Sequence, residues 1–319
     1  MQELTANFVN LVVAFHSRLC KISDSIMERS LSKCPICSHS VEAIGCKRGK
    51  YIDIDFCFNF CPNCKYTYVQ NPVTDYARIY DEKYYSGQGP DPSLDYVFEM
   101  EHPEKSVRMH EWRGIHELVN SLVAVKKETT WLDFGCGNGG LVRHVRESTE
   151  CSADGFEEGW IADRARGLGI PILKREELPG RKGCYDIVTA IEVMEHVIDP
   201  IDCLRNIRDL LKPGGLLFVT TGNAQPHRKR FLKWSYVVPE MHVGYYEPGT
   251  LAWAMRVSGF RPEIRSELQG FDEILKFKIL KNLGARQLFW WEKLIPWRYL
   301  CHAADRRYQV SAHPFGWAN

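Results

Sequence analysis

A glycine-rich turn with a carboxylate on each side is the stretch of this sequence best suited to bind a small molecule. Residues 133–139 read Asp-Phe-Gly-Cys-Gly-Asn-Gly and continue a run of apolar residues. Glycine lets the backbone approach a ligand where any Cβ would clash. Asp133 stands where a carboxylate would repel phosphate but would suit a ligand with cationic groups. Glu157 ends the next apolar run, where its carboxylate can accept hydrogen bonds from two ribose hydroxyls. The pattern favours a nucleoside ligand that carries positive charge.

Two histidines further along the chain could act as a general base, because a neutral imidazole accepts protons near neutral pH. His196 follows the expected strand 186–191, and the spacing of Glu192, Glu195 and His196 groups the three side chains at the start of a helix. We expect Glu195 to orient the imidazole or to bind substrate. His242 lies in the loop after the next expected strand. Each histidine could instead be structural, His196 as scaffolding and His242 as a cap of its loop.

Four cysteines in two C-P-x-C pairs predict a metal site. Each pair turns two thiolates toward one point, and two pairs complete a tetrahedral site for zinc, with iron as the competing metal. The four cysteines fill all four coordination positions of the metal and leave none open for catalysis, so we expect the site to be structural. Cys46 and Cys57, between the pairs, are expected to be core or surface thiols. The expected metal ligands are Cys34, Cys37, Cys61 and Cys64.

Apolar strands that alternate with helical segments from residue 130 onward predict an α/β fold with a parallel sheet. Strands are expected at 66–69, 130–134, 152–156, 170–173, 186–191, 216–221, from 260, and around 275–280. Helical spacing is found over 103–125, from 140, and over 250–258. We divide the chain into an N-terminal helix (1–31), a zinc-binding module (32–72), a connecting segment or lid (73–102), a ligand-binding domain (103–270) and a C-terminal segment with the last strand (271–319).

The segment 73–102 is dense in tyrosine, glycine and proline. Long polar loops within a compact enzyme often act as lids. We therefore expect a flap in which Tyr84 or Tyr85 donates its hydroxyl to a bound ligand. A simple linker between two parts of the chain is the alternative.

The bulk composition is that of an ordinary globular protein, with 319 residues, 45% of them hydrophobic, and a formal net charge of +1. So small a charge argues against a nucleic-acid partner. No stretch approaches the roughly 18 apolar residues that span a bilayer, and the apolar run near the N-terminus lacks a cleavage site. Twelve cysteines without an export signal predict a reducing compartment, the cytoplasm. The aromatic and basic residues of 271–319 are expected to pack on the body or at a homodimer contact, with a peripheral membrane contact as the alternative.

Residues 130–221 resemble the core of class I S-adenosylmethionine (SAM)-dependent methyltransferases, in particular their ubiquinone-biosynthesis-like and sugar-methylating branch. The matching pieces are the turn 132–137, the acid at 157, the stretch 186–197 with its Glu-Val-Met-Glu-His-Val, and the turn 210–217. The resemblance implies a doubly wound, seven-stranded Rossmann-like sheet of order 3-2-1-4-5-7-6 with the last strand antiparallel. It also implies SAM as the methyl donor, S-adenosylhomocysteine as the product, and a cofactor site built from Asp133, Gly135, Cys136, Gly137, Gly139, Glu157, Glu177, Leu178, Ile191 and Glu192.

The resemblance further implies methyl transfer to a small polar acceptor, most of all a hydroxyl of a sugar, nucleotide-sugar or glycan in polysaccharide or natural-product biosynthesis. Carbon methylation of a keto-sugar is the close alternative, because a histidine base can also take a proton beside a carbonyl. Ribosomal-RNA methylation is open as well, and so is a non-catalytic zinc-ribbon scaffold that retains SAM. The loop after the fifth strand helps to build the acceptor pocket in related enzymes. This implication makes Tyr245 and Tyr246, with Tyr84 and Tyr85, the candidate acceptor contacts.

Overall fold

The computed structural model of the protein describes residues 33–75, 79–88, 95–264, 270–297, 299–300 and 314–318. The helix expected over 1–31 lies outside these residues, and so do parts of the segments 73–102 and 271–319. Within the described residues, each helix is too short or too polar to cross a lipid bilayer.

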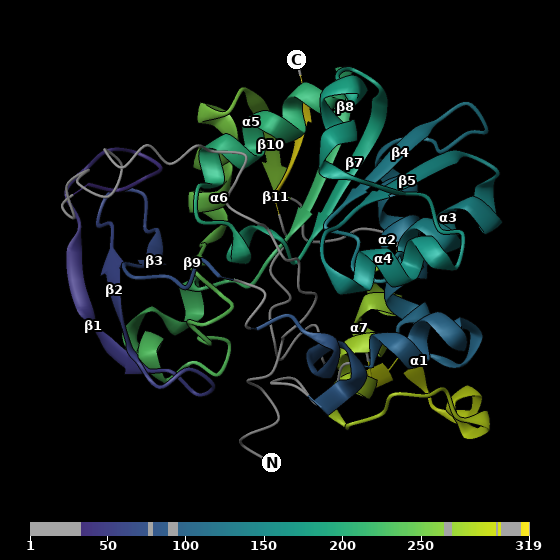
Figure 1. The fold of residues 1–319 in the computed structure, drawn as a ribbon, viewed down its shortest axis with the longest axis horizontal. Coiled ribbons are helices and arrows are strands. Elements are labelled where there is room, and N and C mark those ends of the chain that lie inside the picture. Colours follow the sequence, from purple (N-terminus) through teal and green to yellow (C-terminus); the bar gives the residue numbers. More distant parts are fainter. Residues whose placement is uncertain are drawn as a thin grey trace.

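A seven-stranded sheet forms the centre of the larger part of the molecule (Figure 1). Its strands lie in the order β10-β11-β8-β7-β4-β5-β6. The strands from β6 to β8 pair in parallel, whereas β11 is antiparallel to both of its neighbours. The expected α/β fold with a parallel sheet is confirmed. The strands are β4 (Thr130–Phe134), β5 (Ser152–Phe156), β6 (Ile172–Leu173), β7 (Tyr185–Ile191), β8 (Leu211–Thr220), β10 (Phe260–Ile264) and β11 (Pro314–Ala318).

Helices cover both faces of this sheet, because successive side chains of a strand point to opposite faces. Trp131 and Ile187 belong to a core shared with α2, α3 and α4, while Leu132 and Val188 belong to a second core shared with α5 and α6. The carboxyl ends of the parallel strands are thereby left for loops. The helices are α1 (Tyr96–Glu101), α2 (Met109–Leu122), α3 (Gly140–Thr149), α4 (Trp160–Gly167), α5 (Pro200–Leu210), α6 (Pro248–Val257) and α7 (Phe271–Asn282).

The strand expected around 275–280 is wrong, because these residues lie in helix α7. Asp272 and Glu273 in the first turn and Lys281 in the last turn suit the helix dipole. The helix packs along α2, where the carbonyl of Gly270 approaches Gly114 so closely that a Cβ on Gly114 would lie 2.8 Å from it. The apolar alternation that suggested a strand therefore reflects contacts with a neighbouring helix.

A second, antiparallel sheet joins the cysteine-rich segment to the larger part of the molecule, at the left of Figure 1. Three of its strands come from the cysteine-rich segment, but the fourth, β9, comes from the loop after β8. Thr67 pairs with Tyr245 in this last step. The two parts of the chain therefore share a sheet. The strands are β1 (Glu42–Arg48), β2 (Asp55–Phe60), β3 (Thr67–Val69) and β9 (Gly244–Tyr245).

The expectation that Cys46 and Cys57 are thiols is wrong in this structure. β1 and β2 pair so that the two residues lie directly opposite one another, with their Cα atoms 4.0 Å apart and their sulfur atoms bonded. Their pairing depends on the register of the two strands, which sequence spacing alone does not specify.

Candidate active site

The glycine-rich turn joins β4 to α3 at the carboxyl end of the sheet. Gly135, Gly137 and Gly139 have φ angles of 83°, 54° and 72°, in the left-handed region that side chains disfavour. The backbone N–H groups of Gly135 and Cys136 donate to the carbonyl of Phe156 at 2.8 and 3.1 Å. The turn is therefore held tightly against the end of β5.

Asp133 is buried at the end of β4, with 3% of its surface exposed. The hydroxyl of Thr189, on the neighbouring strand β7, donates to the Asp133 carboxylate at 2.7 Å. Burial raises the pKa of Asp133 to about 7, although the bond from Thr189 acts in the opposite direction. A cationic group beside this carboxylate would restore its charge.

Glu157 lies at the end of β5 and reaches over the same turn. Its carboxylate accepts hydrogen bonds from the backbone N–H groups of Gly137, at 3.0 Å, and Glu158, at 2.8 Å. Burial and the negative charges of Asp133 and Glu157 together raise the pKa of the Cys136 thiol well above its ordinary value. The structure thus brings both carboxylates to the glycine-rich turn, as the sequence suggested.

Three other expected cofactor residues occupy different surroundings. Glu177 is exposed and accepts a hydrogen bond from the backbone N–H of Lys174, so that it caps its own short helix η5 (Arg175–Arg181). Leu178 of the same helix is buried in the core beneath the sheet's second face. Ile191 is buried at the carboxyl end of β7, on the face shared with α2, α3 and α4. Cofactor contacts of these residues stay predictions.

His196 and His242 lie side by side at the carboxyl end of β7, with ring centroids 4.8 Å apart. Nδ1 of His196 lies 2.9 Å from the carbonyl oxygen of Met241, and Nδ1 of His242 lies 2.7 Å from that of Tyr236. A carbonyl can only accept, so each contact favours the tautomer with the proton on Nδ1. Each Nε2 then carries the lone pair that a general base needs.

Glu192 and Glu195 lie beside the histidines, but the predicted helix start is wrong here. Glu192 has a φ of 53°, and the following η6 (Met194–His196) is a single 3₁₀ turn. Helix α5 begins only at Pro200, because Asp199 caps it by accepting from the backbone N–H of Asp202. The sharp turn nevertheless groups the acid and histidine side chains: a carboxylate oxygen of Glu195 and one ring nitrogen from each histidine lie within 4.8 Å of one another.

Tyr236, which sequence patterns did not single out, joins the two carboxylates. Its hydroxyl contacts both Glu195 and Glu192, and it accepts a hydrogen bond from the backbone N–H of Gly222 at 3.1 Å. The Tyr236 hydroxyl has one proton and can donate it to only one carboxylate. Both contacts can therefore be hydrogen bonds only when the other carboxyl is protonated and donates to the Tyr236 oxygen. Burial, followed by the charge of Glu192, raises the pKa of Glu195 well above its ordinary value, which favours the protonated form of this carboxyl.

Comparison with known proteins shows to which protein family this chain belongs. The profile of a family described as "Methyltransferase domain" matches residues 107–263. A ubiquinone biosynthesis O-methyltransferase of Bordetella avium is 33% identical over 170 residues, which cover 48% of this chain and 68% of the relative. The chain belongs to the SAM-dependent methyltransferases. The family suggested by the glycine-rich turn and the Glu-Val-Met-Glu-His-Val stretch is thereby confirmed.

Other members of the methyltransferase family match a smaller share. The ubiquinone biosynthesis O-methyltransferase of Marinobacter nauticus is 37% identical over 134 residues, 38% of this chain and 55% of that protein. The chain spans about half the length of the first such relatives, at 52–55%. Structural similarity extends to a chain in a complex between the Haloferax volcanii Trm112 methyltransferase activator and a candidate methyltransferase, with 18% identity, a TM-score of 0.47, and coverage of 70% of this chain and 96% of that one.

Tyrosines of the segment expected to form a lid lie near Glu157 and His196. Tyr84 and Tyr85 begin the short helix η3 (Tyr84–Gln88) and are almost fully buried. The ring of Tyr85 stacks on Trp160, with centroids 6.0 Å apart, and burial and the charge of Glu157 raise its pKa well above the ordinary value. Tyr80, which sequence patterns did not indicate, places its hydroxyl 3.4 Å from Nδ1 of His196. The segment 79–88 therefore extends from the neighbourhood of Glu157 to the histidines.

The expected acceptor contacts Tyr245 and Tyr246 use their hydroxyls within the protein. Tyr245 donates to the carbonyl of His242 at 2.8 Å, and Tyr246 donates to the carbonyl of Met194 at 3.1 Å. Both side chains are 1% exposed. Their role toward an acceptor stays a prediction, and their visible role is to hold the backbone beside the histidines.

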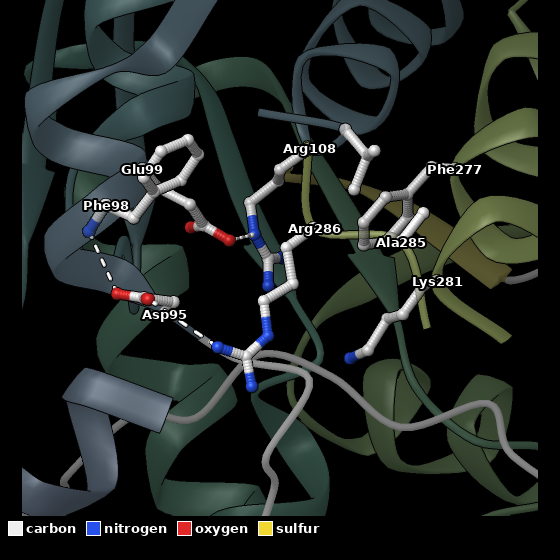
Figure 2. Close-up of a pocket in the computed structure, with 9 residues that line it drawn as sticks. Asp95, Phe98, Glu99, Arg108, Phe277, Lys281, Ala285 and Arg286 are labelled. Atoms are coloured by element: carbon white, nitrogen blue, oxygen red, sulfur yellow. Dashed lines mark hydrogen bonds and ion pairs between the residues drawn. The ribbon is translucent and has the colours of Figure 1, made fainter. Parts of the chain in front are cut away.

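A buried ion-pair network contacts the glycine-rich turn through Asn138. Arg108 pairs with Glu99 at 3.0 Å and with Glu111 at 2.6 Å, and all three are buried. The second oxygen of Glu99 accepts from the side chain of Asn138, whose own oxygen accepts from the N–H of Gly140. Figure 2 shows Glu99 and Arg108 facing one another in a pocket closed on its far side by residues of and beyond α7. No sequence pattern indicates this network, because its members lie on separate elements.

The four cysteines of the two C-P-x-C pairs come together beside the turn between β2 and β3. The sulfur atoms of Cys34 and Cys64 lie 3.5 Å apart and those of Cys37 and Cys61 lie 3.4 Å apart, and all four lie within 4.8 Å of one another. A hydrogen bond from Cys64 lowers the pKa of Cys34 to about 5. The predicted four-cysteine cluster is confirmed. It is anchored to the methyltransferase domain by Thr250, whose hydroxyl donates to the carbonyl of Cys64 at 2.5 Å.

Proposed function

We propose that the protein transfers a methyl group from SAM to a hydroxyl oxygen of a small polar acceptor. The observation that carries this proposal is the pair His196 and His242, each oriented by a backbone carbonyl so that Nε2 can take a proton. Several relatives are named O-methyltransferases, which favours oxygen as the acceptor atom. Sugar, nucleotide-sugar or glycan hydroxyls remain our preferred acceptors on the sequence resemblance.

The donor supplies a methyl group on a sulfonium, so the protein chiefly has to align the reactants and exclude water. Asp133, ionised by a cationic neighbour, would hold the ammonium end of the donor, while Glu157 would exchange its backbone contacts for the ribose hydroxyls. His196 or His242 would take the acceptor proton as the new bond forms. Glu195 and Tyr236 would fix the position of this pair.

We further propose that the segment 79–88 closes over both ligands. Tyr85 supports this role because its buried hydroxyl has no hydrogen-bond partner among the described residues. A buried donor of this kind is costly unless a ligand satisfies it. A linker would have no reason to bury a tyrosine against Trp160 and near the negative charge of Glu157.

We also propose that the four-cysteine cluster holds a structural zinc ion. Tetrahedral Zn–S bonds of about 2.3 Å place neighbouring sulfur atoms about 3.8 Å apart, and the observed sulfur separations accommodate this geometry. Cys34, Cys37, Cys61 and Cys64 would supply all four ligands, leaving no position for substrate. Elemental analysis of the purified protein should give one zinc per chain, whereas one iron per chain would assign the competing metal.

The proposed chemistry is tested by methyl incorporation into a panel of sugars and nucleotide-sugars, comparing the wild type with His196→Ala and His242→Ala. Loss of a general base should lower kcat by about 10²–10⁴-fold in at least one variant. His102→Ala, a half-buried histidine outside the pair, is the matched control and should leave kcat unchanged. Affinity for S-adenosylhomocysteine should be preserved in all three. Wild-type turnover in both site variants would remove the histidine base from the mechanism.

A further inference from the structure

A groove open to solvent lies between the small sheet and the segment that follows β8. The hollow measures about 470 Å³. One wall is the short helix η7 (Gln225–Lys233), and Ile44, Phe60 and Thr67 of the small sheet contribute to the other. Phe231 and Leu232 add apolar surface to the lining. The groove is thus large enough for a small organic ligand with a ring that packs on apolar side chains.

Positive charge dominates the lining of this groove. Arg228, Lys229, Arg230 and Lys233 line it, and Glu247 is the one acid among the lining residues. Arg228 binds both oxygens of Glu247, one of them at 2.7 Å, so this acid is already neutralised. The side chains of the other three cations are exposed, and none pairs with a carboxylate in the part of the chain that the structure describes. Three cations are therefore left for a ligand.

The groove is connected to the proposed catalytic histidines through two packed rings. Phe231, which lines the groove, meets Tyr245 edge to face, with centroids 4.9 Å apart. Tyr245 in turn donates its hydroxyl to the backbone carbonyl of His242. Ala224, also in the lining, bonds through its N–H to the carbonyl of Tyr246. The groove wall and the loop that carries His242 are one packed unit.

We propose that this groove binds the diphosphate of a nucleoside diphosphate-linked acceptor. The proposal rests on the proposed methyl transfer and specifies its acceptor. Exposed lysine and arginine side chains match phosphate oxygens in charge and hydrogen-bond geometry, and the apolar lining suits the flat ring of a nucleoside. A neutral sugar would leave the three cations unused, and an RNA strand would need a longer basic face than this single segment offers.

The test is calorimetric titration of the full chain with uridine diphosphate, inorganic pyrophosphate and uridine. Both phosphate compounds should bind, uridine should bind at least tenfold more weakly than uridine diphosphate, and the binding should weaken when salt rises from about 50 to about 300 mM. The triple change Lys229→Gln, Arg230→Gln and Lys233→Gln should lower the affinity for uridine diphosphate at least tenfold. The KM for the acceptor in the methylation assay should rise with it.

A matched control removes three cations elsewhere, with Lys126→Gln, Arg256→Gln and Arg261→Gln, all exposed and outside the groove. It should bind uridine diphosphate like the wild type. Equal affinity in the two triple variants, or no binding of either phosphate compound, would overturn the proposal, and so would binding only to vesicles of phosphatidylglycerol in phosphatidylcholine. Titration with S-adenosylhomocysteine separates the proposed methyl transfer from the proposed acceptor. If S-adenosylhomocysteine binds but neither phosphate compound does, the proposal of a nucleoside diphosphate-linked acceptor is wrong and the proposed methyl transfer stands.

Discussion

Replacement of Asp133 by asparagine tests whether a buried carboxylate binds the cationic end of the cofactor. Asparagine keeps the size of the side chain and an oxygen that can accept from Thr189, which donates to Asp133 at 2.7 Å. It removes only the charge. A hydrogen bond to a charged group is worth about 1.5–3 kcal/mol, so affinity for S-adenosylhomocysteine should fall by about 10- to 150-fold.

The pH dependence gives a sharper measure of the same interaction. The pKa of Asp133 in the ligand-free protein is about 7, and the ligand should bind the ionised form. The ionised fraction falls tenfold for each pH unit well below the pKa, so affinity should be about eightfold weaker at pH 6, and about 80-fold weaker at pH 5, than at pH 7.5. Asp133→Asn should bind weakly but with little dependence on pH over this range.

Calorimetry from pH 5 to pH 7.5 provides the assay, with Asp209→Asn as the control. Asp209 is an exposed acid at the end of α5, beside the start of β8 and away from the strand ends that form the site. Its loss should leave both the affinity and the pH profile unchanged. A wild-type affinity that is flat across this range, or an Asp133→Asn profile as steep as that of the wild type, would refute the assignment.

Three further predictions concern stability. Tyr236→Phe removes the hydroxyl shared by two buried carboxyls and should lower the free energy of unfolding by about 2–3 kcal/mol. Tyr246→Phe, which loses one bond to the Met194 carbonyl and a long contact at 3.5 Å with the Tyr66 hydroxyl, should lower it by only about 1 kcal/mol. Chemical denaturation measures both. Because the pKa of Glu195 is raised in the folded state, its contribution to the free energy of unfolding is full below pH 4.5 and is lost as pH rises through the folded-state pKa. The melting temperature of the wild type should therefore fall with rising pH, and Glu195→Gln should make this fall less steep. Gly140→Ala should destabilise the fold because its Cβ would lie 2.0 Å from the Trp112 ring, whereas Gly167→Ala, with open space around it, should be tolerated.

Local patterns in the sequence were sufficient for the central elements of the methyltransferase domain. Strands β4 and β5 occupy the residues that their apolar runs predicted, and α3 begins at Gly140 as expected. The glycine-rich turn was predictable because its residues are contiguous: Asp133 and the glycines follow one another along the chain. The four cysteines were predictable for the same reason, since each C-P-x-C pair is complete within four residues.

The arrangement around the histidines was decided by the tertiary structure. Tyr236 reaches Glu195 only because the loop after β8 folds back over the end of β7. The hydrophobic periodicity of the sequence does not predict the path of such a loop. The same loop supplies β9 to the small sheet, so that the cysteine-rich segment pairs with the loop that carries His242. The helix at 271–282 in place of a strand, and the bond between Cys46 and Cys57, have a similar origin.

The sequence by itself therefore determined the fold class, the family and the position of the glycine-rich turn, because these depend on residues that interact with near neighbours along the chain. The tertiary structure alone decided which carboxyls share the Tyr236 hydroxyl, which tautomer each histidine contact favours, and where positive charge collects in the groove. These properties depend on burial and on contacts between segments far apart in sequence. Such contacts set the local dielectric and the available partners, which no single stretch of residues can specify.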